Sequence, residues 1–317
     1  MLNCNDTNIS SATFLLAGIP GLGAESSWIS IPFCLLYLIA ILGNGLILFV
    51  IQTQKNLHQP MYLFLSMLSV TDLGLSASTM PTVISVLLFN NREIGLDVCL
   101  TQLFFIHSVS VVESSVLLAM AFDRFVAIRH PLRYASTLNS SRIGNIWVAS
   151  IIRASGLHIP AVILLKRLPY SRVQPLSYSY CLHADVMKVA CADTIPNSLY
   201  GLFIVLSTLI LDAVLIVLSY ILILSTVMGI ASWRKRLKAL NTCISHICVT
   251  LLFYIPPISL SIIQRFMKNA VPQSQILGTY LHLLLPPVLN PIVYCIKTKK
   301  IRKQIMKIFQ NCSTNRL

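Results

Sequence analysis

The sequence predicts an all-α membrane protein: a bundle of seven transmembrane helices followed by a short amphipathic cytosolic helix. Of the 317 residues, 56% are hydrophobic and only 11% are charged. Soluble domains carry about 25% charged residues, so one soluble core could not bury this much apolar surface. The mean hydropathy of +0.76 agrees with a chain that faces lipid. The apolar residues also fall into runs of about 20 or more, the length that crosses a bilayer as a helix.

Seven apolar runs are long enough to span a membrane. Strands of a membrane barrel are about 10 residues long and alternate between apolar and polar side chains. These runs are longer and lack that alternation, so helices are expected. Their predicted bounds are Ile29–Val50, Tyr62–Leu88, Leu100–Ile128, Ile143–Leu165, Leu199–Met228, Leu240–Ile263 and Ile276–Ile296.

Basic residues between the runs predict how the chain crosses the membrane. The segments after the first, third and fifth runs, and the tail, carry Lys and Arg without a compensating acid, whereas the opposite segments mix both signs. The positive-inside rule therefore places the tail in the cytosol and the N-terminus outside. The net charge of +14 is thus read as an orientation signal and not as a nucleic-acid surface. We expect a multi-pass plasma-membrane protein with an extracellular segment 1–28, a transmembrane domain 29–296 and a cytosolic tail 297–317.

Two short patterns agree with this orientation. Asn5 and Asn8 each begin a glycosylation acceptor triplet near the predicted outer terminus. Asn139 begins a third triplet, but it lies on the predicted inner side and should remain unmodified. In the tail, apolar residues recur at helical spacing among lysines, which predicts a helix lying on the membrane surface.

Ionisable residues inside the spans are expensive to place in lipid and are treated as functional candidates. Asp72 and Glu113 lie on different spans, where they could share a Na⁺ ion or a proton, or could be separately hydrogen-bonded. Asp123 and Arg124 end the third span, either as an ion pair that holds a closed state or as a pair that reaches the interface.

Two basic side chains lie toward the predicted outer side. His107 is about two turns inside the third span, and Arg265 ends the sixth. Together they could hold an anion, because Arg binds a carboxylate through two hydrogen bonds. From the residues alone, a core histidine and an interfacial arginine are the favoured interpretation.

Five strings go beyond composition. The first span contains Gly43 and Asn44. PMYLFLSMLSVTDLGLSAST begins at Pro60, MAFDRFVAIRHPLRY at Met120 and KALNTCISHICVTLLFYIPP at Lys238, and PPVLNPIVY ends at Tyr294. In order and over essentially the whole chain, these strings resemble the odorant receptor family of G-protein-coupled receptors. SYSYCLHADVMKVACAD and LLKRLPY resemble its class I, fish-like branch, which is associated with carboxylic acids and other polar odorants.

The resemblance implies roles for individual residues. Cys99 and Cys181 match a disulfide between the third span and the second outer loop. For the ligand, His107 and Arg265 match headgroup positions, Ser261 would add a hydrogen bond, and Val111 would contact the apolar tail. Asp72 and Glu113 match a sodium site, and this ion is the sole cofactor expected. The residues that match the switch toward the G protein are Arg124 with its resting partner Asp123, Tyr220, Asn290, Pro291 and Tyr294.

The expected partners are a small odorant, the lipid bilayer and a stimulatory G protein that raises cAMP, with no nucleic acid. Three positions are notable against the branch. Ala184 stands where a Gln is usual. Ser171 stands where a cysteine is common, so Cys191 is expected to lack its usual partner. His158 is an added titratable group near the outer half of the fourth span, where it could belong to the ligand pocket or to the core.

Two other classes of protein were weighed against a receptor. A transporter or channel could use the same buried charges, but no internal repeat is found. An enzyme is not expected, since no GxSxG, HExxH or P-loop string occurs.

Overall fold

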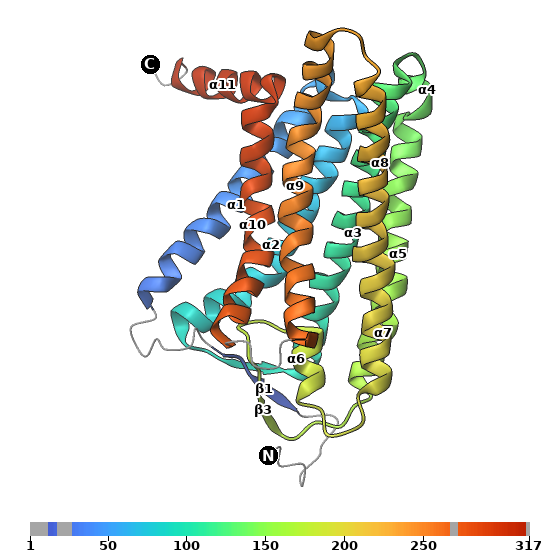
Figure 1. The fold of residues 1–317 in the computed structure, drawn as a ribbon. Coiled ribbons are helices and arrows are strands. Elements are labelled where there is room, and N and C mark those ends of the chain that lie inside the picture. The colour runs from blue at the N-terminus through green and yellow to red at the C-terminus, as the bar shows by residue number, and fades with distance from the viewer. Residues whose placement is uncertain (1–11, 18–26, 267–271, 315–317) are drawn as a thin grey trace.

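The computed structural model describes residues 12–17, 27–266 and 272–314. Within these ranges, seven helices are long and apolar enough to cross a membrane, as the hydropathy pattern predicts. The spanning helices are α1 (Ser27–Thr53), α2 (Pro60–Phe89), α3 (Leu96–Arg129), α5 (Ser140–Lys166), α7 and α8 together (Ile195–Val205 and Leu211–Met228), α9 (Trp233–Phe266) and α10 (Pro272–Lys297). They form one bundle with α11 (Lys299–Thr314) lying across one end (Figure 1).

The fifth span is not a uniform α-helix. Leu206–Ile210, between α7 and α8, form a π-helical segment. A π-turn adds one residue to the turn and widens the backbone, and such turns are frequent at functional sites. Hydropathy could not reveal it, because the apolar run continues unbroken through all three parts.

Helices α1 and α10 approach each other closely at a glycine. A Cβ atom on Gly43 would lie 2.9 Å from Cγ of Pro291, so a larger residue would push the two helices apart. The neighbouring Asn44 donates a 2.8 Å hydrogen bond to the backbone carbonyl of Pro287. Helix α10 contains three prolines: Pro286, Pro287 and Pro291. Proline removes a backbone donor from a helix and leaves a carbonyl without its partner. Pro291 has no N–H to donate to the carbonyl of Pro287 four residues earlier, so Asn44 supplies the missing donor.

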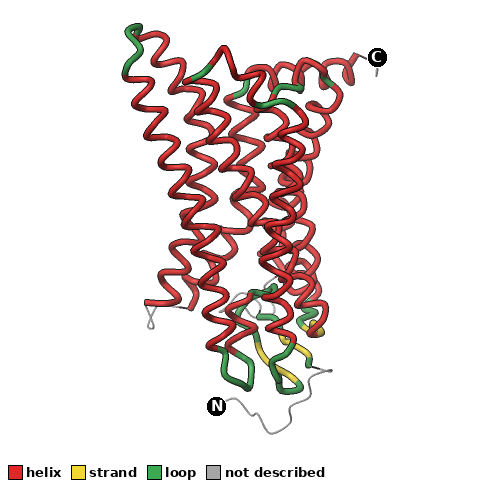
Figure 2. The backbone as a smooth tube through the Cα atoms, turned by 90° about the vertical axis from the view of Figure 1, so that its right-hand side faces the viewer, coloured by secondary structure: helices red, strands yellow, loops and turns green. Residues whose placement is uncertain are grey.

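A small sheet closes the end of the bundle opposite α11, and the sequence did not predict it. Strand β1 (Thr13–Leu15) pairs antiparallel with β2 (Glu93–Gly95) and parallel with β3 (Val173–Pro175). The ring of Phe14 is fully buried and packs edge-on against Tyr170, with ring centroids 5.4 Å apart. The N-terminal segment is therefore held against two loops (Figure 2).

Disulfides fix the long loop between α5 and α7. Cys99 at the start of α3 is bonded to Cys181, which confirms the expected pair. Ser171 lies beside Cys191, with Oγ 3.8 Å from Sγ. Cys191 is nevertheless disulfide-bonded, and its partner is not the residue at position 171. The loop retains a second covalent constraint although Ser171 cannot supply it.

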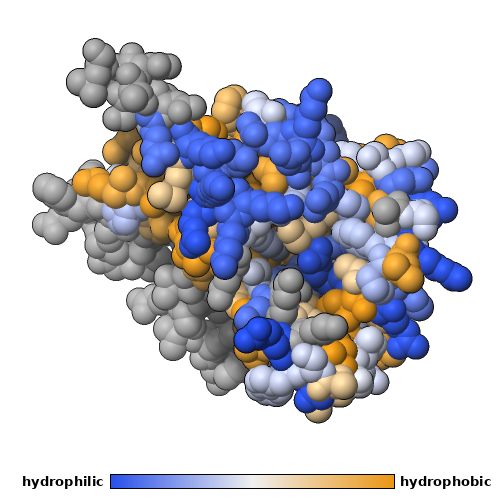
Figure 3. Space-filling model, turned by 90° about the horizontal axis from the view of Figure 1, so that it is seen from above, coloured by the Kyte–Doolittle hydropathy of each residue, from blue (hydrophilic) through white to orange (hydrophobic). Residues whose placement is uncertain are grey.

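Helix α11 is amphipathic. Ile301 and Ile305 are buried against the bundle, and Ile308 is partly buried. Its basic side chains are exposed: Lys299, Lys300, Arg302, Lys303 and Lys307. Figure 3 shows hydrophilic side chains gathered over this end of the molecule.

Candidate functional site

A cavity of about 250 Å³ lies within the bundle, near the end closed by the sheet. Helices α3, α5, α7, α9 and α10 line its sides together with the π-helical segment, and the short helix α6 (His183–Lys188) lies across it. Most of the lining is apolar, with hydroxyl groups from Ser110, Ser114 and Thr208. Its size suits one small organic molecule.

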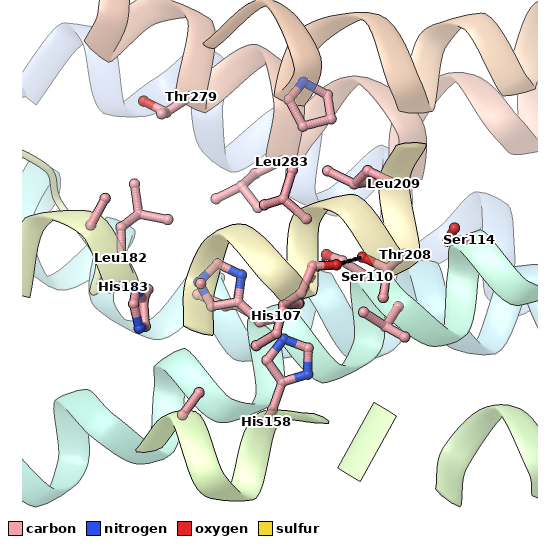
Figure 4. A pocket seen from close by; sticks show the side chains of 18 of the residues that line it. His107, Ser110, Ser114, His158, Leu182, His183, Thr208, Leu209, Thr279 and Leu283 are labelled. Carbon is pink, nitrogen blue, oxygen red and sulfur yellow. Dashed lines mark hydrogen bonds between the residues drawn. The ribbon is translucent and has the colours of Figure 1, made fainter. Parts of the chain in front are cut away.

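Three histidines from three separate elements line this cavity: His107 from α3, His158 from α5 and His183 from α6. The rings of His107 and His158 are stacked, with centroids 5.8 Å apart and an interplanar angle of 8°. Figure 4 shows the three imidazoles on one side of the cavity and Leu209 and Leu283 on the other. The site thus joins a polar wall to an apolar wall.

His183 lies close to His158 and Gly201. Burial, together with the neighbouring His158, lowers the pKa of His183 to about 4, so its ring is neutral at physiological pH. A Cβ atom on Gly201 would lie 3.3 Å from Cε1 of His183, so the glycine makes room for the ring. Its Nε2 atom is buried without a hydrogen-bond partner among the described residues.

The structure brings together some of the expected ligand residues. His107 and Val111 both line the cavity, and so does Ala184. Ser261 and Arg265 lie in the last turns of α9, but their side chains are outside the described residues. His158, which had no assigned role, is part of the cavity wall. Its place could not be read from the sequence, because the stack joins α3 to α5.

An ion pair with a buried carboxylate lies beneath the cavity. Arg153 of α5 donates hydrogen bonds of 2.9 and 3.0 Å to the two carboxylate oxygens of Asp212 in α8. Asp212 also accepts a 2.7 Å bond from Ser114, whose hydroxyl is 2.7 Å from that of Tyr254 in α9. Arg153 also donates to the carbonyl of Ser207 in the π-helical segment, at 2.7 Å. The network links four spans, and the pairing of Arg153 with Asp212 depends on how α5 lies against α8 and is not visible in the sequence.

Asp72 and Glu113 lie deeper in the bundle and are both completely buried. Asn290 of α10 donates to both oxygens of Asp72, at 3.1 and 3.0 Å. Asp72 lies on α2 and Glu113 on α3, two helices that pack against each other. Neither carboxyl oxygen of Glu113 has a hydrogen-bond partner in the described part of the chain. Carboxylate oxygens with unused acceptor capacity fit a hard cation such as Na⁺, or a retained proton.

Three of the expected switch residues, Asp123, Arg124 and Tyr220, lie toward the α11 end of the bundle. Arg124 pairs with Asp123, its Nε lying 2.9 Å from Oδ2, and Tyr134 donates a 2.7 Å bond to Oδ1. The hydroxyl oxygen of Tyr220 in α8 lies 2.5 Å from Nδ1 of His246 in α9. This histidine contact was not anticipated.

The residues expected to act together in the switch are thus divided between two regions. Asn290 belongs with Asp72, and Pro291 packs beside Gly43. The side chain of Tyr294 is buried, and its hydroxyl has no partner among the residues that the structure describes.

Seven spanning helices, a cavity at one end and an ion-paired arginine at the other define a seven-helix membrane receptor. The chain belongs to the olfactory receptor family, whose model, described as "Olfactory receptor", matches residues 33–312. Human olfactory receptor 51G2 is 55% identical over 96% of this chain and 97% of its own length. Human olfactory receptors 51A4 and 51E2 are 51% and 47% identical over 95% and 98% of this chain, covering 96% of their own lengths in each case.

Membership of this family gives the general function. The protein is an odorant receptor of the G-protein-coupled class, a multi-pass plasma-membrane protein and not an enzyme. A transporter or channel is not favoured.

Proposed function

We propose that this receptor binds a small organic acid in the histidine-lined cavity and activates a stimulatory G protein, which raises cAMP. The observation that carries the proposal is the cavity itself, which joins three imidazoles to an apolar wall. Imidazole donates hydrogen bonds to a carboxylate, and leucine accepts an alkyl chain. Arg265 and Ser261 are proposed to complete the headgroup site.

A cAMP assay with acids and alcohols of matched chain length tests the ligand class. Arg265→Ala should reduce the potency of an acid roughly tenfold or more, because a hydrogen bond to a charged group is worth about 1.5–3 kcal/mol. The potency of the alcohol should change little. An acid response that is unchanged in the variant would show that the headgroup assignment is wrong.

The proposed switch is the release of Arg124 from Asp123 when a ligand favours the active state. A ligand shifts this equilibrium only by its differential affinity for the two states. The contacts of Asp123 with Arg124 and Tyr134 support its role in holding the resting state. Asp123→Asn should raise cAMP in the absence of ligand, measured at matched surface expression, whereas unaltered basal cAMP would argue against the lock.

We also propose that Asp72 and Glu113 hold a sodium ion, with Asn290 orienting Asp72. The N-terminus and the cavity are proposed to face outward, so that α11 lies on the cytosolic leaflet. Exposed lysines on α11 support this orientation, because anionic lipids attract basic side chains.

A further inference from the structure

The cavity is basic without being charged. Its described lining contains three histidines and one tyrosine, but no Asp, Glu, Lys or Arg. A neutral imidazole is at once a donor and an acceptor, and it becomes a cation by accepting one proton. Three such groups meet on one wall, so the cavity holds a reserve of positive charge that appears only on protonation.

The hydrogen bond of His158 fixes its proton. Nδ1 lies 3.0 Å from the carbonyl oxygen of Ala154, and a carbonyl can only accept, so Nδ1 carries the hydrogen. The lone pair is then on Nε2, the atom where a further proton would bind. His183 likewise keeps a buried Nε2 without a partner among the described residues. Two of the three rings therefore retain a site for a proton.

No acidic side chain in the described cavity lining could pair with a protonated imidazole, so the counter-ion must come from a ligand. From the loop before α6, Tyr180 lines the cavity, and burial raises the pKa of its hydroxyl well above the usual value. Asp185 of α6 is outside the lining and accepts a 2.6 Å bond from the backbone of Ser177.

The remaining elements present no free charge in their described parts. α7, α9 and α10 contribute only apolar and hydroxyl residues to the lining. The pair of Arg153 and Asp212, beneath Ser114, is already neutralised.

We propose that His107, His158 and His183 form an anion subsite that takes up one proton together with the headgroup of an organic anion. This inference rests on the proposed function and makes His158 a determinant of ligand specificity. The anion pairs with the imidazolium, which adds a second cation to the one that Arg265 is proposed to supply. Without the proton, the three rings would offer the anion only hydrogen bonds from neutral groups in exchange for its hydration.

Proton uptake makes affinity depend on pH, with a defined sign. Burial and His158 lower the pKa of His183 to about 4 in the empty cavity, and a bound anion raises the pKa of an adjacent imidazole. Between the two values, binding consumes one proton, so affinity rises as pH falls. One proton corresponds to at most about tenfold per pH unit.

The test uses three ligands of one chain length on the full-length receptor in lipid nanodiscs. Pentanoate and pentanesulfonate are anions, and pentanol is neutral. Because a sulfonate stays ionised throughout, its pH dependence reports protons taken up by the protein and not by the ligand. The affinity of each is measured from the shift in thermal unfolding at pH 7.4 and 6.4. We expect pentanesulfonate to bind several-fold to tenfold more tightly at pH 6.4, and pentanol equally at both.

Substitutions assign the effect to the cluster. His158→Phe keeps an aromatic ring beside His107, and His183→Gln keeps a polar group beside Gly201, but neither can be protonated. The double variant should lose most of the pH dependence for pentanesulfonate, whereas its affinity for pentanol should again be equal at the two pH values. Equal sulfonate affinity at both pH values, or an unreduced dependence in the double variant, overturns the inference and leaves an acid-binding receptor intact. No binding of either anion at any pH overturns the proposed function as well.

Discussion

The residues Arg153 and Asp212 form an ion pair near the middle of the membrane. Arg153 is 13 residues from each end of α5 (Ser140–Lys166), which places it roughly 20 Å along the helix from either end. The side chain of Asp212 is 2% exposed and that of Arg153 is 30% exposed. A buried pair is tolerated when geometry is good and the remaining donors are satisfied. Here the carboxylate is held through both oxygens, and Ser115 and Ser207 accept further bonds from Arg153.

Breaking this pair from one side should be severe. Asp212→Leu leaves the Arg153 guanidinium without its counter-ion, and we expect a loss of about 3–5 kcal/mol in the free energy of unfolding. Thermal unfolding of the purified receptor measures the effect. Arg153→Met combined with Asp212→Leu should recover most of it, since both charges are then absent.

The exposed pair of Lys166 and Asp97 provides the control. Its side chains are 61% and 76% exposed. Lys166→Met should therefore change stability by less than about 1 kcal/mol. A comparable loss at both pairs would show that burial is not the cause.

The proposed sodium site at Asp72 and Glu113 predicts that sodium stabilises the folded receptor. A bound cation stabilises the folded state in proportion to the logarithm of its concentration once the site is occupied. Replacing choline chloride by sodium chloride at constant ionic strength should raise the unfolding temperature of the wild type. Asp72→Asn should remove this difference. If the difference persists in the variant, sodium acts elsewhere.

Among the elements, the sequence predicts some far better than others, for physical reasons. Spanning helices are visible because lipid requires long apolar runs with internally satisfied backbone. Strand β1 is three residues long and pairs with strands 78 or more residues away, so no local pattern predicts it. The stacking of His107 on His158 likewise depends on how α3 lies against α5. Motifs, by contrast, located Cys99 and Cys181, because that bond accompanies the recognised strings.

Helix α11 owes its position to one apolar face. Ile301 is fully buried, whereas Met306 on the same helix is 56% exposed. Ile301→Asp buries an unpaired carboxylate and should lower the free energy of unfolding by about 3 kcal/mol or more. Met306→Asp makes the same chemical change on the exposed face and should have a much smaller effect on thermal unfolding. Equal losses would indicate that both faces are covered in the membrane.

The whole molecule has two chemically different ends. The sheet lies at one end and the basic helix α11 lies at the other (Figures 1 and 2). The disulfide between Cys99 and Cys181 and the cavity lie toward the sheet end. Extracellular surroundings permit disulfides, and cytosolic surfaces collect Lys and Arg. Both indications therefore give the same proposed orientation from independent chemistry.

Glycosylation tests this orientation, because oligosaccharyltransferase reaches only the luminal side. Asn5 and Asn8 lie outside the described residues, near the proposed outer end. Replacing both by Gln should abolish the mobility shift that peptide-N-glycosidase produces on a gel. Asn139→Gln should leave that shift unchanged.

The Asn139→Gln variant should also lower the stability of the protein slightly. Asn139 caps α5, accepting a 2.8 Å bond from the backbone of Arg142, so its acceptor triplet has a structural cause independent of glycans. Loss of a cap typically lowers stability by about 1 kcal/mol. Thermal unfolding of Asn139→Gln should show a small decrease while its glycan pattern matches the wild type. A glycan that disappears with Asn139 would instead place this end of α5 in the lumen and invert the proposed orientation of the whole bundle.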